Sequence, residues 1–266
     1  MAAGGASGAG FHHAWEYGMA VRSRGGGSRT LVWIHGLGES GRCFDAIARH
    51  AALSPYRHVI PDLPGYGRSP WPLAPRSLDE TADELAVWLT SRADDAVLIG
   101  HSLGGVLATV CLERHPQAAR AIVDVDGNCA LDDCTFSRRL AAFAEEDAAA
   151  AAEQVWTWVA EQAGADPALR GYAASLAFAD PRVLWRHARD LVAASGAETL
   201  AARRARLAVP LLYVAGDPRG ASPRARALLD AAGVEVAAVG PAGHWPFIDQ
   251  PLAFAEIVAR FVERIT

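Results

Sequence analysis

The chain contains no lysine: all 25 of its basic residues are arginine. Schiff-base catalysis, lysine-anchored pyridoxal phosphate and a Walker A phosphate loop all need a lysine amine, so these chemistries are excluded. Cysteine is also scarce, and the four cysteines are Cys43, Cys111, Cys129 and Cys134. They are too few and too scattered for a disulfide framework, and the spacing of the last two matches no common metal motif. We therefore expect small buried residues or free thiols, and no metal site.

An excess of positive charge and a long apolar run are absent as well. The 25 basic residues are outnumbered by 30 acidic ones, which gives a net charge of −5 and no basic stripe for nucleic acid. No apolar stretch reaches the roughly 18 residues of a membrane span. Residues 1–14 have neither the charged nor the apolar region of a signal peptide. We expect a flexible N-terminus, a cytoplasmic location and no nucleic-acid or membrane partner, while the oligomeric state stays open.

Short apolar or β-branched runs alternate with helical segments along most of the chain. The pattern predicts strands at 15–22, 30–35, 58–61, 96–99, 121–126, 210–216 and 234–239, and helices at 42–52, 77–91, 103–114, 222–232 and 251–265. This alternation is typical of a mostly parallel, doubly wound α/β sheet with helices on both faces. Residues 128–206 are alanine-rich and helical, without a strand pattern. The expected architecture is a core of residues 15–127 and 207–266, with a helical cap of residues 128–206 inserted between two strands.

One pentapeptide, Gly100-His101-Ser102-Leu103-Gly104, follows a predicted strand and opens a predicted helix. This G-x-S-x-G pattern in this setting is typical of a nucleophile elbow, in which the serine hydroxyl stands on a sharp turn above the sheet. A serine hydroxyl needs an adjacent base to become a good nucleophile. Of the nine histidines, His244 lies in a loop between the last predicted strand and the last predicted helix, from which it could reach Ser102.

Three further segments stand at the ends of predicted strands: His35-Gly36-Leu37-Gly38, Asp62-Leu63-Pro64-Gly65-Tyr66-Gly67-Arg68-Ser69 and Gly243-His244-Trp245-Pro246. With the elbow, and in this order, they make the chain resemble the α/β-hydrolase superfamily over about residues 15–265. The resemblance is to the branch with a serine nucleophile and a cap. It implies Ser102 as nucleophile, His244 as base, and the backbone N–H groups of Leu37 and Leu103 as the oxyanion hole. His35 and His101 are expected to be structural.

The acid of the triad is where the sequence departs from the family's common pattern. The strand before the last one usually ends in Gly-x-x-Asp, but here it ends in Gly216-Asp217-Pro218-Arg219. An alternative within the superfamily places the acid after the strand that follows the elbow helix, and Asp126 occupies that position. We expect Asp126 to be the acid because it stands at the strand's C-terminal tip, and we keep Asp217 as the alternative.

These residues predict a serine hydrolase that cleaves an ester, lactone or thioester of a small molecule through an acyl-enzyme, without cofactor or metal. The predicted cap carries Trp156, Trp158, Phe178 and Trp185, which could line an apolar substrate pocket or simply form the core of the cap. A cofactor-free haloperoxidase or perhydrolase and a carbon–carbon bond hydrolase share the same residues and stay open.

Two hypotheses that place the chain in another functional class also stay open. A protein with this fold could bind a ligand without hydrolysing it. In addition, the segment from Gly36 to Gly41 is a literal G-x-G-x-x-G, with Asp62 about 20 residues on, as in dinucleotide-binding domains. That second reading leaves the elbow and His244 unexplained.

Overall fold

A computed structural model describes residues 10–92 and 95–265. Its eight-stranded sheet has the order β1-β2-β4-β3-β5-β6-β7-β8. The strands are β1 (His12–Glu16), β2 (Met19–Arg24), β3 (Thr30–Ile34), β4 (Arg57–Asp62), β5 (Ala96–His101), β6 (Ala121–Val125), β7 (Leu211–Pro218) and β8 (Val236–Ala242). β2 pairs antiparallel with β1 and β4, and all other pairs are parallel. The predicted mostly parallel α/β sheet is confirmed.

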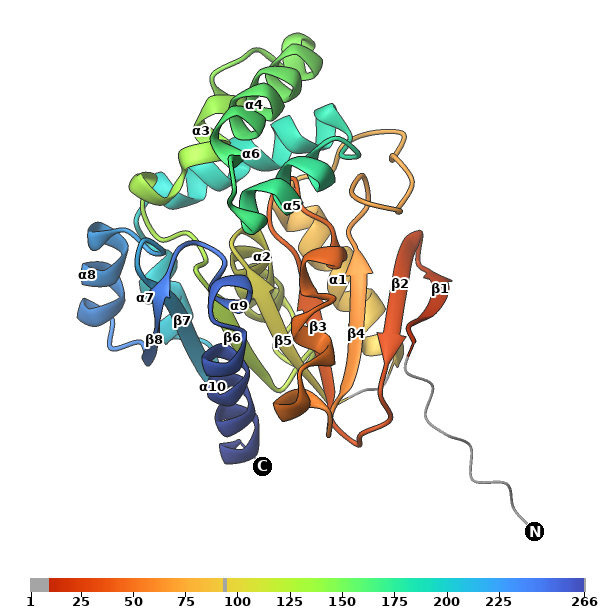
Figure 1. Cartoon of the computed structure of the whole chain (residues 1–266), viewed down its shortest axis with the longest axis vertical. Helices are drawn as coiled ribbons and strands as arrows, with labels where there is room; N and C mark the ends of the chain where they lie inside the picture. The colour runs from red at the N-terminus through yellow and green to blue at the C-terminus, as the bar shows by residue number, and fades with distance from the viewer. Residues whose placement is uncertain (1–9, 93–94, 266) are drawn as a thin grey trace.

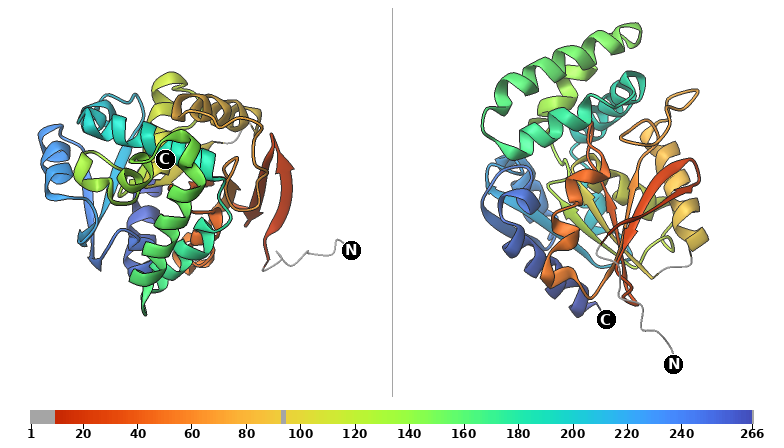
Figure 2. Two further views of the ribbon diagram at one scale, coloured as in Figure 1. Left: turned by 90° about the horizontal axis from the view of Figure 1, so that it is seen from above. Right: turned by 45° about the vertical axis from the view of Figure 1, so that its right-hand side comes forward.

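Helices cover both faces of the sheet, which is why the parallel strands read as continuous apolar runs. The α-helices are α1 (Leu78–Arg92), α2 (Leu103–Arg114), α3 (Thr135–Ala141), α4 (Ala148–Ala163), α5 (Pro167–Leu176), α6 (Pro181–Gly196), α7 (Leu200–Ala205), α8 (Pro223–Ala231), α9 (Pro246–Asp249) and α10 (Pro251–Arg264). The described residues also form short 3-10 helices: η1 (Gly41–Phe44), η2 (Ile47–Arg49) and η3 (Ala51–Leu53) between β3 and β4, η4 (Leu131–Asp133) between β6 and α3, and η5 (Glu145–Asp147) between α3 and α4. Figure 1 shows α1 and α2 behind the sheet and α10 in front, and the right-hand view of Figure 2 shows the sheet between these two layers.

The segment between β6 and β7 forms helices and no strand, and every one of its residues is described. Helices α3 to α6, hereafter the upper layer, lie above the carboxyl ends of the parallel strands (Figure 1). Helix α7 packs instead against α2 and α8, two helices that cover the sheet. The upper layer therefore stands over the edge of the sheet at which ligands bind in open α/β folds.

Three local predictions differ from the structure. The strand predicted at 15–22 is a hairpin of β1 and β2, because Tyr17 and Gly18 adopt positive φ values of 50° and 77° and turn the chain back. Residues 12–14, expected to be flexible, belong to β1, while residues 1–9 of that segment lie outside the described residues. The helix predicted at 42–52 is the series η1 to η3, because His50 has an extended backbone (φ −65°, ψ 138°) that ends η2.

None of the helices in the described ranges combines the length and the apolar character needed to cross a membrane.

Candidate active site

Ser102 stands at the turn between β5 and α2, with φ 53° and ψ −118°. This positive φ is strained for a residue with a side chain, and such strain is concentrated at functional sites. The flanking glycines make the turn possible. A Cβ on Gly104 would lie 2.2 Å from the Ile34 carbonyl oxygen, and one on Gly100 would lie 2.4 Å from the Gly104 oxygen. The predicted elbow geometry is present at this site.

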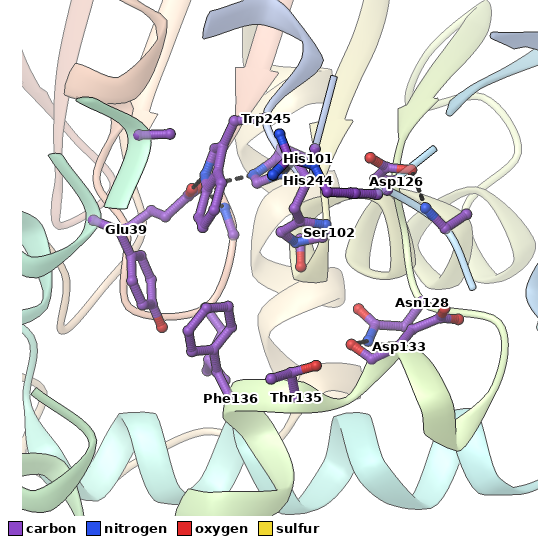
Figure 3. A pocket seen from close by; sticks show the side chains of 18 of the residues that line it. Glu39, His101, Ser102, Asp126, Asn128, Asp133, Thr135, Phe136, His244 and Trp245 are labelled. Carbon is purple, nitrogen blue, oxygen red and sulfur yellow. Dashed lines mark hydrogen bonds and ion pairs between the residues drawn. The ribbon is translucent and has the colours of Figure 1, made fainter. Parts of the chain in front are cut away.

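Ser102 is half-buried and opens into a cavity of about 310 Å³ between the strand ends and the upper layer. Figure 3 shows Ser102 facing the space bounded by His244 and Asp126 above and by the upper layer below. The core contributes His101, Asp126 and His244 to the cavity wall, and the upper layer contributes Phe136 and Tyr172. The size falls at the lower end of the roughly 300–1,000 Å³ of small-molecule sites.

His244 lies between β8 and α9, and its half-buried ring faces the cavity. The rings of His101 and His244 are 4.7 Å apart, centroid to centroid. Burial, together with the charge of His101, lowers the pKa of His244 to about 3. Within the described residues, the His244 ring makes no hydrogen bond to Ser102 or to Asp126. The ring is therefore neutral at ordinary pH.

Glu39 is a residue of this site that the sequence did not reveal. Its buried carboxylate accepts hydrogen bonds from the Gly36 N–H (2.6 Å), the His101 Nδ1 (2.9 Å) and the Trp245 indole N–H. The opposite ring nitrogen of His101, Nε2, donates to the His244 carbonyl oxygen at 2.8 Å. Burial alone would raise the pKa of Glu39, but the charge of His101 and the three hydrogen bonds lower it to about 2.

Both nitrogens of His101 therefore carry protons, because a carbonyl and an ionised carboxylate can only accept. Although burial acts in the other direction, the Glu39 carboxylate raises the pKa of His101. His101 was expected to be a packing residue. Instead, it is one half of a buried ion pair that joins the Gly36 loop, the elbow and the His244 loop.

Asp126 follows β6 and lines the cavity, with 2% of its surface exposed. Its carboxylate accepts hydrogen bonds from the Gly216 N–H (3.1 and 3.3 Å) and the Ala221 N–H (2.8 Å). Burial raises the pKa of Asp126 to about 8 against the effect of these two amides. Asp217, the alternative acid, is half-exposed, pairs with Arg226 at 3.2 Å, and does not line this cavity.

The two amides expected to form the oxyanion hole are without an acceptor among the described residues. Leu37 lines the cavity, and the following residue, Gly38, has a positive φ of 75°. Leu103 is the first residue of α2, where helix N–H groups have no intrahelical partner. Both amides are therefore free to donate.

None of the four aromatic residues suggested for a substrate pocket lines the cavity of Ser102. The indole N–H groups of Trp156 and Trp185 donate to backbone carbonyls of the upper layer, at 3.1 and 2.9 Å. Trp158 packs against Phe136, and Phe178 is 67% exposed beside a second cavity. Helical spacing alone could not separate these residues from Phe136 and Tyr172, which do line the site.

The site lacks two features that other chemistries would need. In the part of the chain that the structure describes, no group of three or more His, Cys, Asp or Glu side chains is placed to hold a metal ion. The G-x-G-x-x-G segment leads into η1, not into a long helix whose N-terminus could hold a pyrophosphate. Asp62 is buried and accepts hydrogen bonds from the Gly41 and Arg68 amides.

A serine on a strained strand-to-helix turn, at the carboxyl edge of a parallel sheet, defines an α/β fold with a nucleophile elbow. Residues 31–257 match the family described as "Alpha/beta hydrolase family". The chain belongs to this family.

Individual relatives match shorter stretches. Lipase LipV of Mycobacterium tuberculosis is 37% identical over 107 residues, which cover 40% of each chain. Pimeloyl-acyl-carrier-protein methyl ester esterase of Sodalis glossinidius is 38% identical over 105 residues, 39% of this chain and 38% of that one. The chain thus matches about two fifths of the length of these relatives.

Solved structures cover the whole fold at lower identity. A thermophilic esterase from Thermogutta terrifontis superposes with a TM-score of 0.76 at 16% identity, over 96% of this chain and 99% of that one. This likeness concerns the fold alone.

Proposed function

We propose that the chain is a serine hydrolase that cleaves an ester, lactone or thioester of a small molecule through an acyl-enzyme. The observation that carries the proposal is the strained turn that holds Ser102 in a cavity beside His244 and Asp126. The names of the relatives, a lipase and a methyl ester esterase, favour an ester over other acyl compounds. The reaction needs no metal or cofactor.

In the proposed reaction, Ser102 Oγ attacks the carbonyl carbon while neutral His244 takes its proton. The Leu37 and Leu103 amides bind the negative oxygen that forms, and loss of one such donor typically costs about 10²–10³ in rate. The leaving alcohol takes the proton from His244 as its bond to the carbonyl carbon breaks. Water then attacks the acyl carbon and gives a proton to His244, which passes it to Ser102 Oγ as the bond between Oγ and the acyl carbon breaks and the acid is released.

Asp126 is proposed to orient the His244 ring and to stabilise the imidazolium that forms. Its carboxylate is buried at the cavity wall, whereas Asp217 is half-exposed and paired with Arg226. Hydrogen bonds between catalytic groups are often long without substrate and shorten in the complex, so the absence of a bond from the His244 ring among the described residues is compatible with this role.

A fluorophosphonate probe tests the nucleophile. We expect the probe to label the wild type at Ser102, and Ser102→Ala to lose labelling together with at least about 10³ of its rate on a phenyl ester. Mass spectrometry of the labelled peptide and a melting curve of the variant are the measurements. A folded Ser102→Ala variant that keeps wild-type turnover would exclude the proposed mechanism.

The same assay separates the two candidate acids. Asp126→Asn should lower kcat by up to about 10⁴, because the imidazole then loses the carboxylate that fixes its tautomer. Asp217→Asn is the matched control, and we expect it to stay within about threefold of the wild type because surface substitutions have small effects. The reverse pattern would assign the acid to Asp217.

A further inference from the structure

The cavity of Ser102 contains a buried polar atom without a partner among the described residues. Asn128 lies on the loop after β6, two residues beyond Asp126, and only 2% of its surface is exposed. Its Oδ1 atom has no hydrogen-bond partner in the part of the chain that the structure describes. Figure 3 shows Asn128 on the cavity wall between Asp126 and the residues of the upper layer.

The orientation of the Asn128 amide is fixed by its other atom. The Nδ2 group donates to the Asp133 carbonyl oxygen at 3.1 Å and to the Cys134 sulfur at 3.6 Å. If the amide were flipped, Oδ1 would face a carbonyl oxygen, and neither of the two can donate. The free atom is therefore the oxygen, which can only accept a hydrogen bond.

The surrounding loop is held in place, so Asn128 cannot easily turn away. The Asn128 carbonyl oxygen accepts from the buried Arg204 guanidinium at 3.1 Å. The Asp133 carboxylate accepts from the Cys129 and Ala130 amides at 2.8 and 2.9 Å, and from the Ser222 amide at 2.9 Å. The Cys129 and Ala130 amides are thus already used within the loop, and Oδ1 is left without a donor among the described residues.

We propose that Asn128 is a specificity residue whose Oδ1 accepts a hydrogen bond from a hydroxyl or an amide N–H of the substrate. This inference rests on the proposed function and narrows its substrate class to esters that carry a neutral hydrogen-bond donor near the scissile bond. A precisely placed polar group in a ligand pocket fixes the orientation of the ligand. An analogue without the donor leaves that group unpaired and is rejected.

Matched phenyl esters test the inference through a ratio of kcat/KM values. One pair is phenyl 3-hydroxybutanoate and phenyl 3-methoxybutanoate, and the other is phenyl N-acetylglycinate and phenyl N-acetyl-N-methylglycinate. We expect the wild type to prefer the donor-bearing member of at least one pair by about 10- to 100-fold. The pair that shows the preference identifies the donor as a hydroxyl or as an amide.

Asn128→Leu and Asn128→Ala should bring that ratio to within about threefold of one. The ratio is insensitive to the amount of folded enzyme and to the reactivity of Ser102, because both esters meet the same variant. Thr135→Val is the matched control, since it removes a hydroxyl from the same cavity, and its ratio should stay at the wild-type value. A collapse of the ratio in Thr135→Val as large as in the Asn128 variants would contradict the assignment to Asn128.

Different experimental results would overturn the role of Asn128 and the proposed function. Equal turnover of both members of each pair by the wild type, with Ser102 labelled by fluorophosphonate, overturns the role of Asn128 alone. This comparison needs no variant, so it decides the matter even if the Asn128 variants do not fold. No turnover of any ester and no labelling would overturn the proposed function, and the inference with it.

Discussion

His101 occupies the variable position of the elbow, and its ion pair with Glu39 connects the segments around Ser102. Glu39 also accepts from the Gly36 and Trp245 N–H groups, and His101 donates to the His244 carbonyl. The pair is completely covered, with 1% and 3% of the two side chains exposed. A buried charge pair with every oxygen and nitrogen bonded holds its neighbours in one geometry. We expect it to set both the position and the protonation of His244.

Glu39→Gln should therefore change the pH dependence of the reaction. In the proposed mechanism His244 acts as a base only when neutral, so kcat/KM falls as the pH drops through its pKa. In the wild type the pKa of His244 is lowered to about 3, whereas the pKa of Asp126 is raised to about 8, so the acidic limb expected near pH 8 reports Asp126 and His244 adds a limb only at much lower pH. Without the Glu39 charge, His101 becomes neutral, and the loss of the His101 charge raises the pKa of His244. Burial, the largest cause of the shift, still holds that pKa below its ordinary value.

The measurement is kcat/KM on one phenyl ester between about pH 4 and pH 9, and at the acidic end of this range the variant should lose rate at a higher pH than the wild type. Glu256→Gln is the control, because Glu256 is an exposed residue of α10 that pairs with Arg260. An unchanged acidic limb in a folded Glu39→Gln variant would contradict the role given to the ion pair.

Glu39 could not be predicted from the sequence because its partners lie far from it along the chain. His101 is 62 residues away and Trp245 is 206 residues away, so only the folded chain brings them together. Ser102 and His244 could be singled out because local sequence marks the ends of strands. The same holds for Asp126, which the structure places at the tip of β6. The aromatic residues of the upper layer have no such local mark, since core and cavity positions share the same helical spacing.

At the scale of elements, regular strands and long helices follow the apolar pattern, while short turns do not. Helix α1 begins within one residue of the predicted start, and Ser77 and Glu80 form a capping box, with the Ser77 amide donating to Glu80 at 2.8 Å. The hairpin turn at Tyr17 and the series η1 to η3 depend on single backbone angles. Those angles are set by tertiary packing, not by periodicity.

Helix α6 is attached to the core through a buried histidine. His187 Nδ1 lies 2.8 Å from the Tyr66 hydroxyl, and its Nε2 lies 3.2 Å from the Thr81 hydroxyl. Thr81 already donates to the Ser77 carbonyl, so the Nε2 proton points to Thr81 and Nδ1 accepts from Tyr66. The upper layer is thereby connected to α1 and to the loop after β4 by a neutral imidazole.

His187→Gln should reduce the pH dependence of stability. Burial lowers the pKa of His187 to about 4, whereas in the unfolded chain it is near 6.5. The unfolded state therefore binds more protons between these values, and this residue's contribution to the free energy of unfolding falls by up to about 3 kcal/mol as the pH drops through that window. The stability difference between wild type and variant should narrow accordingly.

Urea unfolding followed by tryptophan fluorescence at about pH 7, 5.5 and 4.5 is the measurement. His12→Gln, at an exposed position of β1, is the control and should run parallel to the wild type. A His187→Gln variant whose deficit stays constant between pH 7 and pH 4.5 would contradict the neutral buried state of His187.

At the scale of the whole molecule, one buried ion pair links the inserted segment to the sheet below the site. Arg204 of α7 donates from Nε to Asp124 of β6 at 2.5 Å, and both side chains are fully buried. The other oxygen of Asp124 accepts from the Gly127 amide at 3.0 Å, and Arg204 also donates to the Asn128 carbonyl at 3.1 Å. The pair thus lies directly beneath the loop that carries Asp126 and Asn128. The sequence places Asp124 in a strand, but its partner is 80 residues away.

A double-mutant cycle measures what this pair contributes. Arg204→Met leaves the Asp124 carboxylate buried without a counter-charge, and Asp124→Asn does the same to Arg204, so each single change should cost about 3–5 kcal/mol of unfolding free energy. The double variant should lose clearly less unfolding free energy than the sum of the two single variants. It leaves no buried charge uncompensated, and apolar replacement of a buried pair is often close to neutral.

Urea unfolding of the wild type and the three variants gives the coupling energy. The control is the same cycle with Arg203→Met and Glu113→Gln at the neighbouring, half-buried pair. Additive losses at the buried pair would mean that Arg204 and Asp124 act independently and that the loop of Asn128 is held by its backbone contacts alone.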